Sequence, residues 1–226
     1  MDSTGSSFAN FFFLFITLLP LAPALLVFLS RKYDAVPLNI LVLVCMLDLI
    51  KGLLDRFPLS HVDNQYIILN IVSLLEWMAL ILLFKSGVSP PVRRSLHVFL
   101  VGYLSSLVTY YFSTGWDRHS LLLVSVQDGI LIGVIIVCML PLIRHRLLQI
   151  FRSPFFWIAT GSLFYFLLVI LMGWAGPCCL PGSGRPTAEN SILLSIAGLF
   201  RYVLYFQAVL VCRPAGSAEE VRDWGV

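Results

Sequence analysis

The stretch Ile71–Phe84, IVSLLEWMALILLF, is apolar or small at every position except one, Glu76. It belongs to an apolar segment of about 20 residues, the length that an α-helix needs to cross a bilayer. A charged side chain near the middle of a bilayer costs roughly 3 kcal/mol or more unless it is paired or hydrated. The stretch therefore predicts a transmembrane helix, and it requires a partner for Glu76.

The remainder of the chain has the same character. Of its 226 residues 59% are hydrophobic and only 12% are charged, and the mean hydropathy is +0.92. Soluble domains carry about 25% charged residues, so we predict an all-α integral membrane protein. Apolar segments long enough to span a bilayer lie near residues 8–29, 36–54, 66–84, 96–112, 121–143, 154–174 and 191–212. We expect them to form a single seven-helix bundle with a short tail at residues 213–226.

The distribution of lysine and arginine predicts the orientation of this bundle. One set of loops and the tail hold ten basic residues, whereas the opposite side holds four. Since basic loops stay in the cytoplasm, we expect the N-terminus outside, the C-terminus in the cytoplasm and a multi-pass protein of the cell (inner) membrane. The net charge of +3 is scattered along the chain, which argues against nucleic acid as a partner and leaves the lipid bilayer.

The third and seventh segments align with each other without gaps. Ile67–Leu82 matches Ile192–Gln207, with Glu76 opposite Arg201. This similarity indicates a 3+1+3 arrangement of parallel repeats in which the fourth helix is the linker. Two apolar helices can also resemble each other by chance, and the sequence leaves both readings open.

Helical geometry predicts which polar groups meet. At about 1.5 Å per residue, Glu76 and Arg201 lie at matching depths of about 15 and 16 Å from the outer side, so we expect an ion pair. Asp48, with Lys51 and Asp55 along one helical face, and Asp128 are shallow enough to touch water from the outer mouth. Candidates for a ligand or proton site are Glu76, Arg201, Asp128, Asp48, Gln127, Asn70, Tyr165 and Tyr202. The ion pair could equally serve packing alone.

Small and hydroxyl residues predict close helix contacts. We expect the stripe Gly102, Ser106, Thr109 and Ser113 of the fourth helix to face the bundle interior. Gly129 and Gly133 have the Gly-x-x-x-Gly spacing that suits close contact between membrane helices.

The sequence contains no strong motif for catalysis or metal binding. The four histidines fall at helix ends or in loops, and no nucleophile–base pair or metal-ligand spacing occurs at a common depth. We therefore expect no enzyme, no metal and no cofactor. Asp48, Glu76 and Asp128 could together hold a metal ion, but the arginine argues against it. Cys178 and Cys179, in the last outer loop, have no predicted role.

The stretch SPFFWIATGSLFYFLLVIL, Ser153–Leu171, carries a resemblance. It is similar to a group of uncharacterised bacterial seven-helix membrane proteins whose sixth helix opens with Ser-Pro-x-Phe-Trp-Ile. A glycine and a tyrosine follow in that group at the spacing of Gly161 and Tyr165. Its third helix carries a glutamate at the position of Glu76 and its fifth an acidic residue resembling Asp128. Genes of that group often lie near those of sensor kinases, so the resemblance implies a signalling context.

Three classes of function remain. A sensory module would bind a small molecule in a polar outer-half cavity and signal to a cytoplasmic or membrane partner. A small-solute or proton-coupled transporter would use the repeats, protonatable Glu76 or Asp128, and prolines such as Pro141 as hinges. An intramembrane enzyme is the third. A retinal-type photoreceptor is disfavoured, because the seventh helix offers no lysine for a Schiff base.

Overall fold

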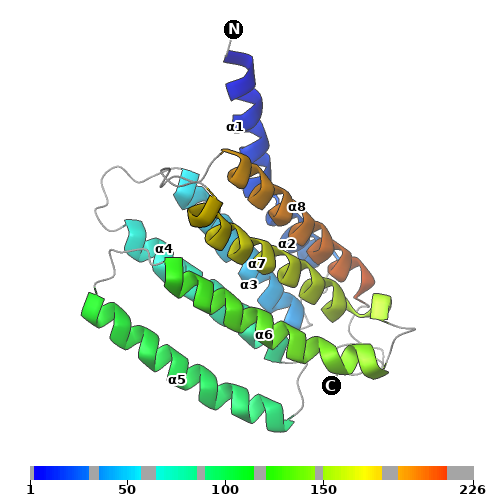
Figure 1. Cartoon of the computed structure of the whole chain (residues 1–226). Coiled ribbons are helices and arrows are strands. Elements are labelled where there is room, and N and C mark those ends of the chain that lie inside the picture. Colours follow the sequence, from blue (N-terminus) through cyan, green and yellow to red (C-terminus); the bar gives the residue numbers. More distant parts are fainter. Residues whose placement is uncertain are drawn as a thin grey trace.

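The computed structural model describes residues 3–30, 36–56, 65–85, 90–114, 121–145, 150–179 and 188–212. Within these ranges every element is helical (Figure 1). The elements are α1 (Ser3–Leu18), α2 (Leu21–Leu29), α3 (Val36–Arg56), α4 (Gln65–Lys85), α5 (Pro90–Thr114), α6 (Leu121–His145), the 3-10 turn η1 (Ile150–Arg152), α7 (Pro154–Cys179) and α8 (Ala188–Val211).

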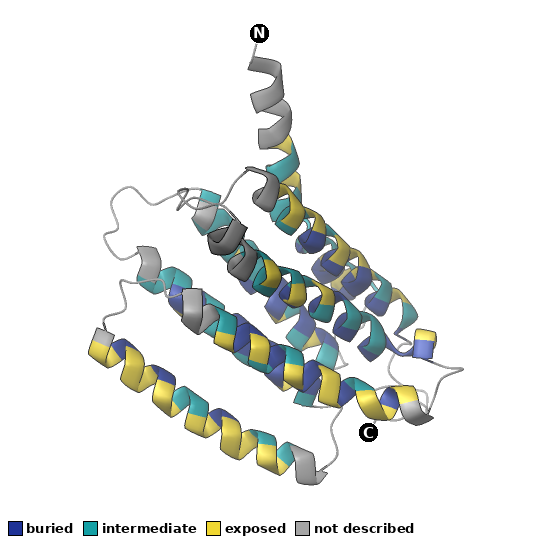
Figure 2. Ribbon diagram, viewed as in Figure 1, coloured by how far each residue is buried: buried dark blue, intermediate teal, exposed yellow. Residues whose placement is uncertain are grey.

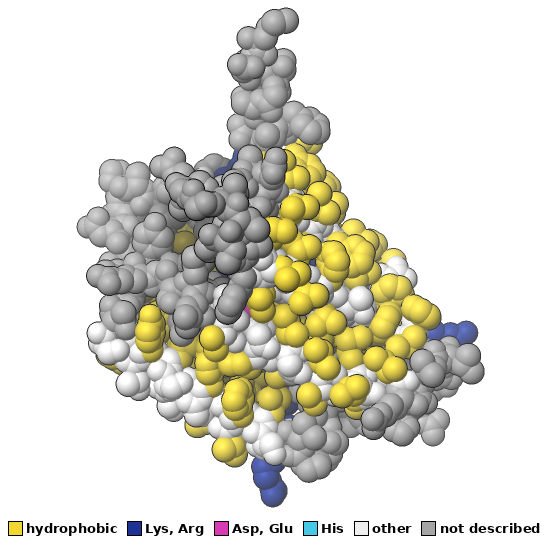
Figure 3. All heavy atoms as spheres, viewed as in Figure 1, with side chains coloured by type: hydrophobic (Ala, Val, Ile, Leu, Met, Phe, Trp, Pro, Cys, Tyr) yellow, Lys and Arg dark blue, Asp and Glu magenta, His cyan; other side chains and the backbone are white. Residues whose placement is uncertain are grey.

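Seven spans are long and apolar enough to cross a membrane, as predicted: Phe11–Leu29, Val36–Leu54, Ile67–Lys85, Arg93–Ser113, Ser125–Ile143, Pro154–Met172 and Ile192–Val211. Apolar side chains cover most of the described surface over α7 and α8 (Figure 3). The protein is therefore a polytopic, all-α membrane protein. The tail at residues 213–226 lies outside the described residues.

The first span differs from the predicted single helix, because α1 ends at Leu18 and α2 begins at Leu21. Pro20 has no N–H to donate to the carbonyl of Ile16, and a proline ring clashes with the carbonyl four residues before it. The N–H of Leu19 donates a hydrogen bond to the carbonyl of Ile16 instead, at 3.2 Å.

Helix α7 is longer than predicted. Its backbone continues through Cys178 and Cys179, which we had placed in a loop.

The helices form a closed ring. Contacts run in the order α2, α3, α4, α6, α7 and α8, and α8 returns to α2. Helix α5 lies along the outer edge of the bundle and exposes most of its surface (Figures 1 and 2).

The hydroxyl stripe of α5 does not face the interior as we predicted. Ser106, Thr109 and Ser113 are exposed, and each hydroxyl donates to a carbonyl of its own helix at 2.7 or 2.8 Å. Such local bonds satisfy a hydroxyl without any neighbour, so a polar stripe can face outward.

Apolar packing fills one half of the ring, near the beginnings of α3 and α7. Leu38, Leu80, Leu83 and Ile158 are fully buried there. Phe84 stacks edge-on against Phe155, with 5.7 Å between ring centroids. This apolar half of the ring adjoins the polar residues described next.

The close contact predicted at Gly129 and Gly133 is found at another glycine, Gly161. A Cβ at Gly161 would lie 3.2 Å from the carbonyl oxygen of Arg201 and 3.2 Å from Cβ of Leu204, so α7 and α8 touch there. By contrast, a Cβ at Gly129 or Gly133 would meet nothing within 4 Å. The Gly-x-x-x-Gly spacing on α6 therefore makes no close contact with the helices that the structure describes.

Candidate functional site: an ion cluster beside a polar cavity

Arg201 is almost completely enclosed, with 1% of its surface exposed. Its Nη2 donates to Oε1 of Glu76 at 3.3 Å, so the predicted ion pair is present. The same nitrogen lies 3.2 Å from Oδ2 of Asp48, although that oxygen makes no aligned hydrogen bond. The cation of α8 thus joins carboxylates of α3 and α4.

Our prediction that Asp48 reaches water is wrong, because only 8% of its side chain is exposed and, unlike Asp128, it does not line the cavity described below. The position of Asp48 along α3 would allow it to reach water at one end of the bundle. However, α3 is rotated so that this carboxylate points toward Arg201. Asp48 is therefore a second counterion of Arg201.

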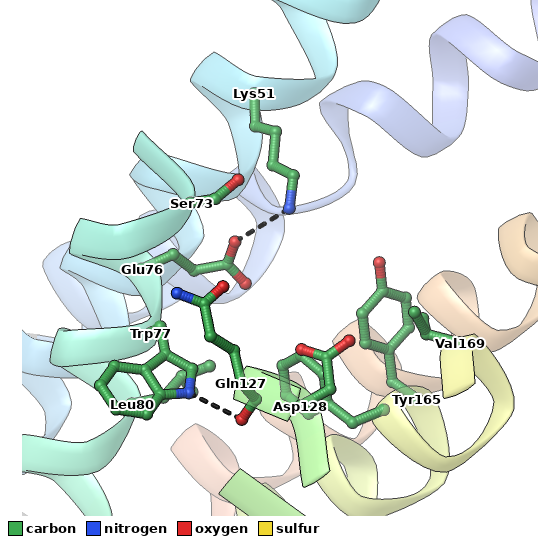
Figure 4. Close-up of a pocket in the computed structure, with 10 residues that line it drawn as sticks. Lys51, Ser73, Glu76, Trp77, Leu80, Gln127, Asp128, Tyr165 and Val169 are labelled. Carbon is green, nitrogen blue, oxygen red and sulfur yellow. Dashed lines mark hydrogen bonds and ion pairs between the residues drawn. The ribbon is translucent and has the colours of Figure 1, made fainter. Parts of the chain in front are cut away.

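Lys51 takes a partner on another helix. Its Nζ lies 3.5 Å from Oε2 of Glu76, and 38% of its side chain is exposed. We had expected it to pair along its own helix with Asp48 and Asp55, and the side chain of Asp55 lies outside the described residues. The two oxygens of Glu76 thus contact different cations, the buried Arg201 and the partly exposed Lys51. Figure 4 shows the contact with Lys51.

Aromatic rings surround the guanidinium group of Arg201. Its Cζ lies 4.8 Å from the ring centroid of Tyr165, 5.2 Å from that of Phe166 and 5.8 Å from that of Tyr202. Ring faces attract cations, more strongly where water is absent. These contacts help to offset the desolvation of a buried charge.

A hydrogen-bond chain fixes the orientation of Arg201. Its Nε donates to Oη of Tyr205 at 2.8 Å, and that hydroxyl shares a 2.6 Å hydrogen bond with Oγ of Ser162. We did not predict Ser162 or Phe166 as site residues. The signal for Tyr205 was available, because it lies four residues after Arg201 and such residues are neighbours on one helical face.

A polar cavity of about 110 Å³ lies on the Lys51 side of Glu76, between α3, α4, α6 and α7. Its lining residues are Lys51, Ser73, Glu76, Trp77, Leu80, Gln127, Asp128, Tyr165, Phe166 and Val169 (Figure 4). One wall is fixed by Trp77, whose Nε1 donates to the backbone carbonyl of Gln127 at 2.9 Å. The cavity therefore borders the ion cluster directly.

Two polar side chains of α6 border this cavity. Asp128 and Gln127 are each only 7% exposed, and neither is among the described side chains whose polar atoms are fully buried without a hydrogen bond. Their position on the lining makes their polar atoms available to whatever occupies the cavity.

All the predicted site residues except Asn70 come together in the cluster or around the cavity. Asn70 is buried on α4, with 6% of its surface exposed, and does not line the cavity. Among the described residues no group of three or more His, Cys, Asp or Glu side chains could hold a metal ion.

Comparison with known proteins gives no relative. No protein-family model matches the chain, and no curated protein or solved structure matches it. The functional argument therefore depends on the geometry of this site.

Proposed function

We propose that this protein is a sensory membrane module that binds a small polar solute in the cavity between α3, α4, α6 and α7. The observation that carries the proposal is the pair of polar side chains on its wall, Gln127 and Asp128, which are each only 7% exposed and border the cavity. Buried polar groups are normally hydrogen-bonded to protein or to ordered water. We therefore expect a polar occupant beside these two side chains.

The cavity limits the size of the solute. At about 30 Å³ per water molecule, a volume of about 110 Å³ holds about four waters. Sites for drug-sized ligands measure roughly 300–1,000 Å³. The ligand is therefore a solute of few heavy atoms.

Charge limits its chemistry. Three carboxyl groups, those of Asp48, Glu76 and Asp128, surround the two cations Arg201 and Lys51, so carboxyl groups exceed cations by one. That excess favours a ligand with one positive charge, such as a small ammonium or guanidinium compound. The rings of Trp77, Tyr165 and Phe166 line the same space and suit a cation. A proton on Asp128 is the competing occupant.

The ion cluster supplies a route from the ligand to the helices. A cation beside Asp128 repels the ammonium group of Lys51 and weakens its contact with Glu76, which also holds Arg201. A ligand shifts a conformational equilibrium by its difference in affinity for the two states. Movement among α3, α4 and α8 would then be read by a cytoplasmic or membrane partner.

Ligand binding is testable on the purified chain in detergent. We expect methylammonium and guanidinium chlorides to raise the apparent Tm saturably at constant ionic strength, with NaCl as the reference salt. Asp128→Asn should abolish this rise, whereas Gly129→Ala, a change at the next residue into open space, should retain it. Equal responses of wild type and Asp128→Asn would contradict the proposal.

Transport is the second candidate, and the pairing of Glu76 with Arg201 motivates it. These two residues occupy equivalent positions in the 3+1+3 repeat that we predict. The ring order of the helices is compatible with such a repeat, as is any ring of six helices in chain order. Repeats of this kind support alternating access in transporters.

Flux separates the two candidates. Proteoliposomes loaded with the protein would take up labelled methylammonium, or acidify in response to it, if the protein is a transporter, and Asp128→Asn would lose that flux. Binding without flux favours the sensor. In either case we propose the orientation in which the N-terminus is outside and the cavity faces outward, because the basic loops flank the opposite ends of the helices.

A further inference from the structure

Two carboxyl groups of the ion cluster face each other. Asp48 of α3 and Glu76 of α4, here called the carboxyl pair, lie at hydrogen-bonding distance from one another. Both also approach Nη2 of Arg201, at 3.2 and 3.3 Å, and their side chains are only 8% and 6% exposed. An ionised carboxylate only accepts hydrogen bonds. A hydrogen bond within the pair therefore requires a proton between the two groups.

The charges around the carboxyl pair also favour a proton. Arg201 and Lys51 face three carboxyl groups, those of the pair and that of Asp128. Buried charges are costly unless they are paired, so the cluster becomes neutral by binding a single proton when the cavity holds no cation. Two carboxyl groups in close contact do not readily ionise together.

This proton has two candidate places, Asp128 and the carboxyl pair. Within the pair it forms a hydrogen bond from O–H to an ionised oxygen, which is short and strong. Asp128 interacts with Glu76 through charge, without a hydrogen bond to it in the described part of the chain. The pair therefore holds the proton more favourably.

The carboxyl pair is enclosed on most sides. The helices α1 and α2, which also contact α3, carry no titratable side chain. Titratable groups face the pair from four helices: Cys45 and Lys51 of α3, Asp128 of α6, Tyr165 of α7, and Arg201, Tyr202 and Tyr205 of α8. Glu76 lines the polar cavity (Figure 4), whereas Asp48 does not. A proton therefore enters and leaves the pair through Glu76.

We propose that Asp48 and Glu76 form a proton-binding site in which one proton is shared between the two carboxyl groups while the cavity holds no cation. A cation beside Asp128 supplies the positive charge that the proton had supplied, and the proton passes through the cavity to bulk water. Cation binding is thereby coupled to proton release. This exchange rests on the ligand proposed above, whereas the shared proton does not.

Infrared spectroscopy of the purified chain in detergent tests the shared proton without any ligand. A protonated carboxyl group has a C=O stretching band that an ionised carboxylate lacks. We expect this band in the wild type at neutral pH, and we expect it to shift when either the aspartate or the glutamate carboxyl carbons are replaced by the heavy isotope. Asp48→Asn and Glu76→Gln should each lose the band, since two carboxylates then balance the two cations. Ser73→Ala, an uncharged change on the cavity wall, should keep it.

The outcomes separate the places of the proton. A band that shifts with labelled aspartate alone would put the proton on a single aspartate, and a wild type without the band would leave no proton to share; either result overturns the proposal. The labelled wild type gives this answer even if a variant fails to fold.

The exchange is tested by adding methylammonium chloride to the same sample, with NaCl as the reference salt. Methylammonium should remove the band and acidify a weakly buffered solution. A raised Tm with an unchanged band would overturn the exchange but leave ligand binding intact. No rise in Tm would overturn the ligand and the exchange together, and the spectrum without ligand would still decide the shared proton.

Discussion

Replacing Arg201 by methionine is expected to be the most damaging single change in the ion cluster. The substitution keeps much of the side-chain length but removes the cation that faces both Asp48 and Glu76. Breaking a buried pair by removal of one partner typically costs about 3–5 kcal/mol. Because two carboxylates lose their counterion, we expect a value at the upper end.

The matching change at Glu76 should cost less. Glu76→Gln leaves Arg201 with Asp48, and Lys51, whose side chain is 38% exposed, is able to recruit water. We therefore expect roughly half the loss of Arg201→Met. Combining Arg201→Met with Asp48→Asn and Glu76→Gln should restore much of the stability, because a neutral, well-packed replacement of a buried ion pair is often tolerated.

The assay is thermal unfolding of the purified chain in detergent, followed by tryptophan fluorescence. At about 2–4 °C per kcal/mol for a chain of this size, a loss of about 5 kcal/mol should lower the apparent Tm of Arg201→Met by roughly 10–20 °C. Arg152→Met, at an exposed position in η1, is the control and should change little. Additive losses in the single and combined variants would refute the reasoning, since groups that interact do not add.

Exchanging the two charges is expected not to rescue stability. A carboxylate at position 201 would lie among the faces of Tyr165, Phe166 and Tyr202, which attract cations. A cation at position 76 would lie beside Lys51. A Tm near the wild-type value in the doubly exchanged variant would show that the rings contribute little.

Three further predictions concern packing and orientation. Tyr205→Phe removes the acceptor of the Arg201 Nε bond and should lower stability by about 1–3 kcal/mol in the same assay. Gly161→Ala forces α7 and α8 apart at contacts of 3.2 Å and should cost about 1–3 kcal/mol; a stabilised variant would argue against the close approach. A cysteine at Asn64 should react with impermeant reagent added to intact cells, whereas one at Ser89 should not, and the reverse pattern would invert the orientation.

Properties that are local along the chain could be predicted from the sequence. Span length and hydropathy depend only on consecutive residues, so the seven apolar helices were found. Depth follows from the rise per residue, so Glu76 and Arg201 were matched. The rotation of a helix about its axis depends on its neighbours, so the role of Asp48 and the outward stripe of α5 were missed. The break at Pro20 was a local signal that we did not use.

The ion cluster also has a consequence for how the chain is assembled. Asp48 and Glu76 belong to α3 and α4, whereas their shared counterion arrives on α8, after every other described helix has been synthesised. Until then two carboxylates face one lysine inside the membrane. A bundle that lacks α8 therefore carries buried carboxylates without their shared counterion, and this excess of negative charge distinguishes it from the finished protein. The ion cluster is complete only when α8 has packed against α3 and α4.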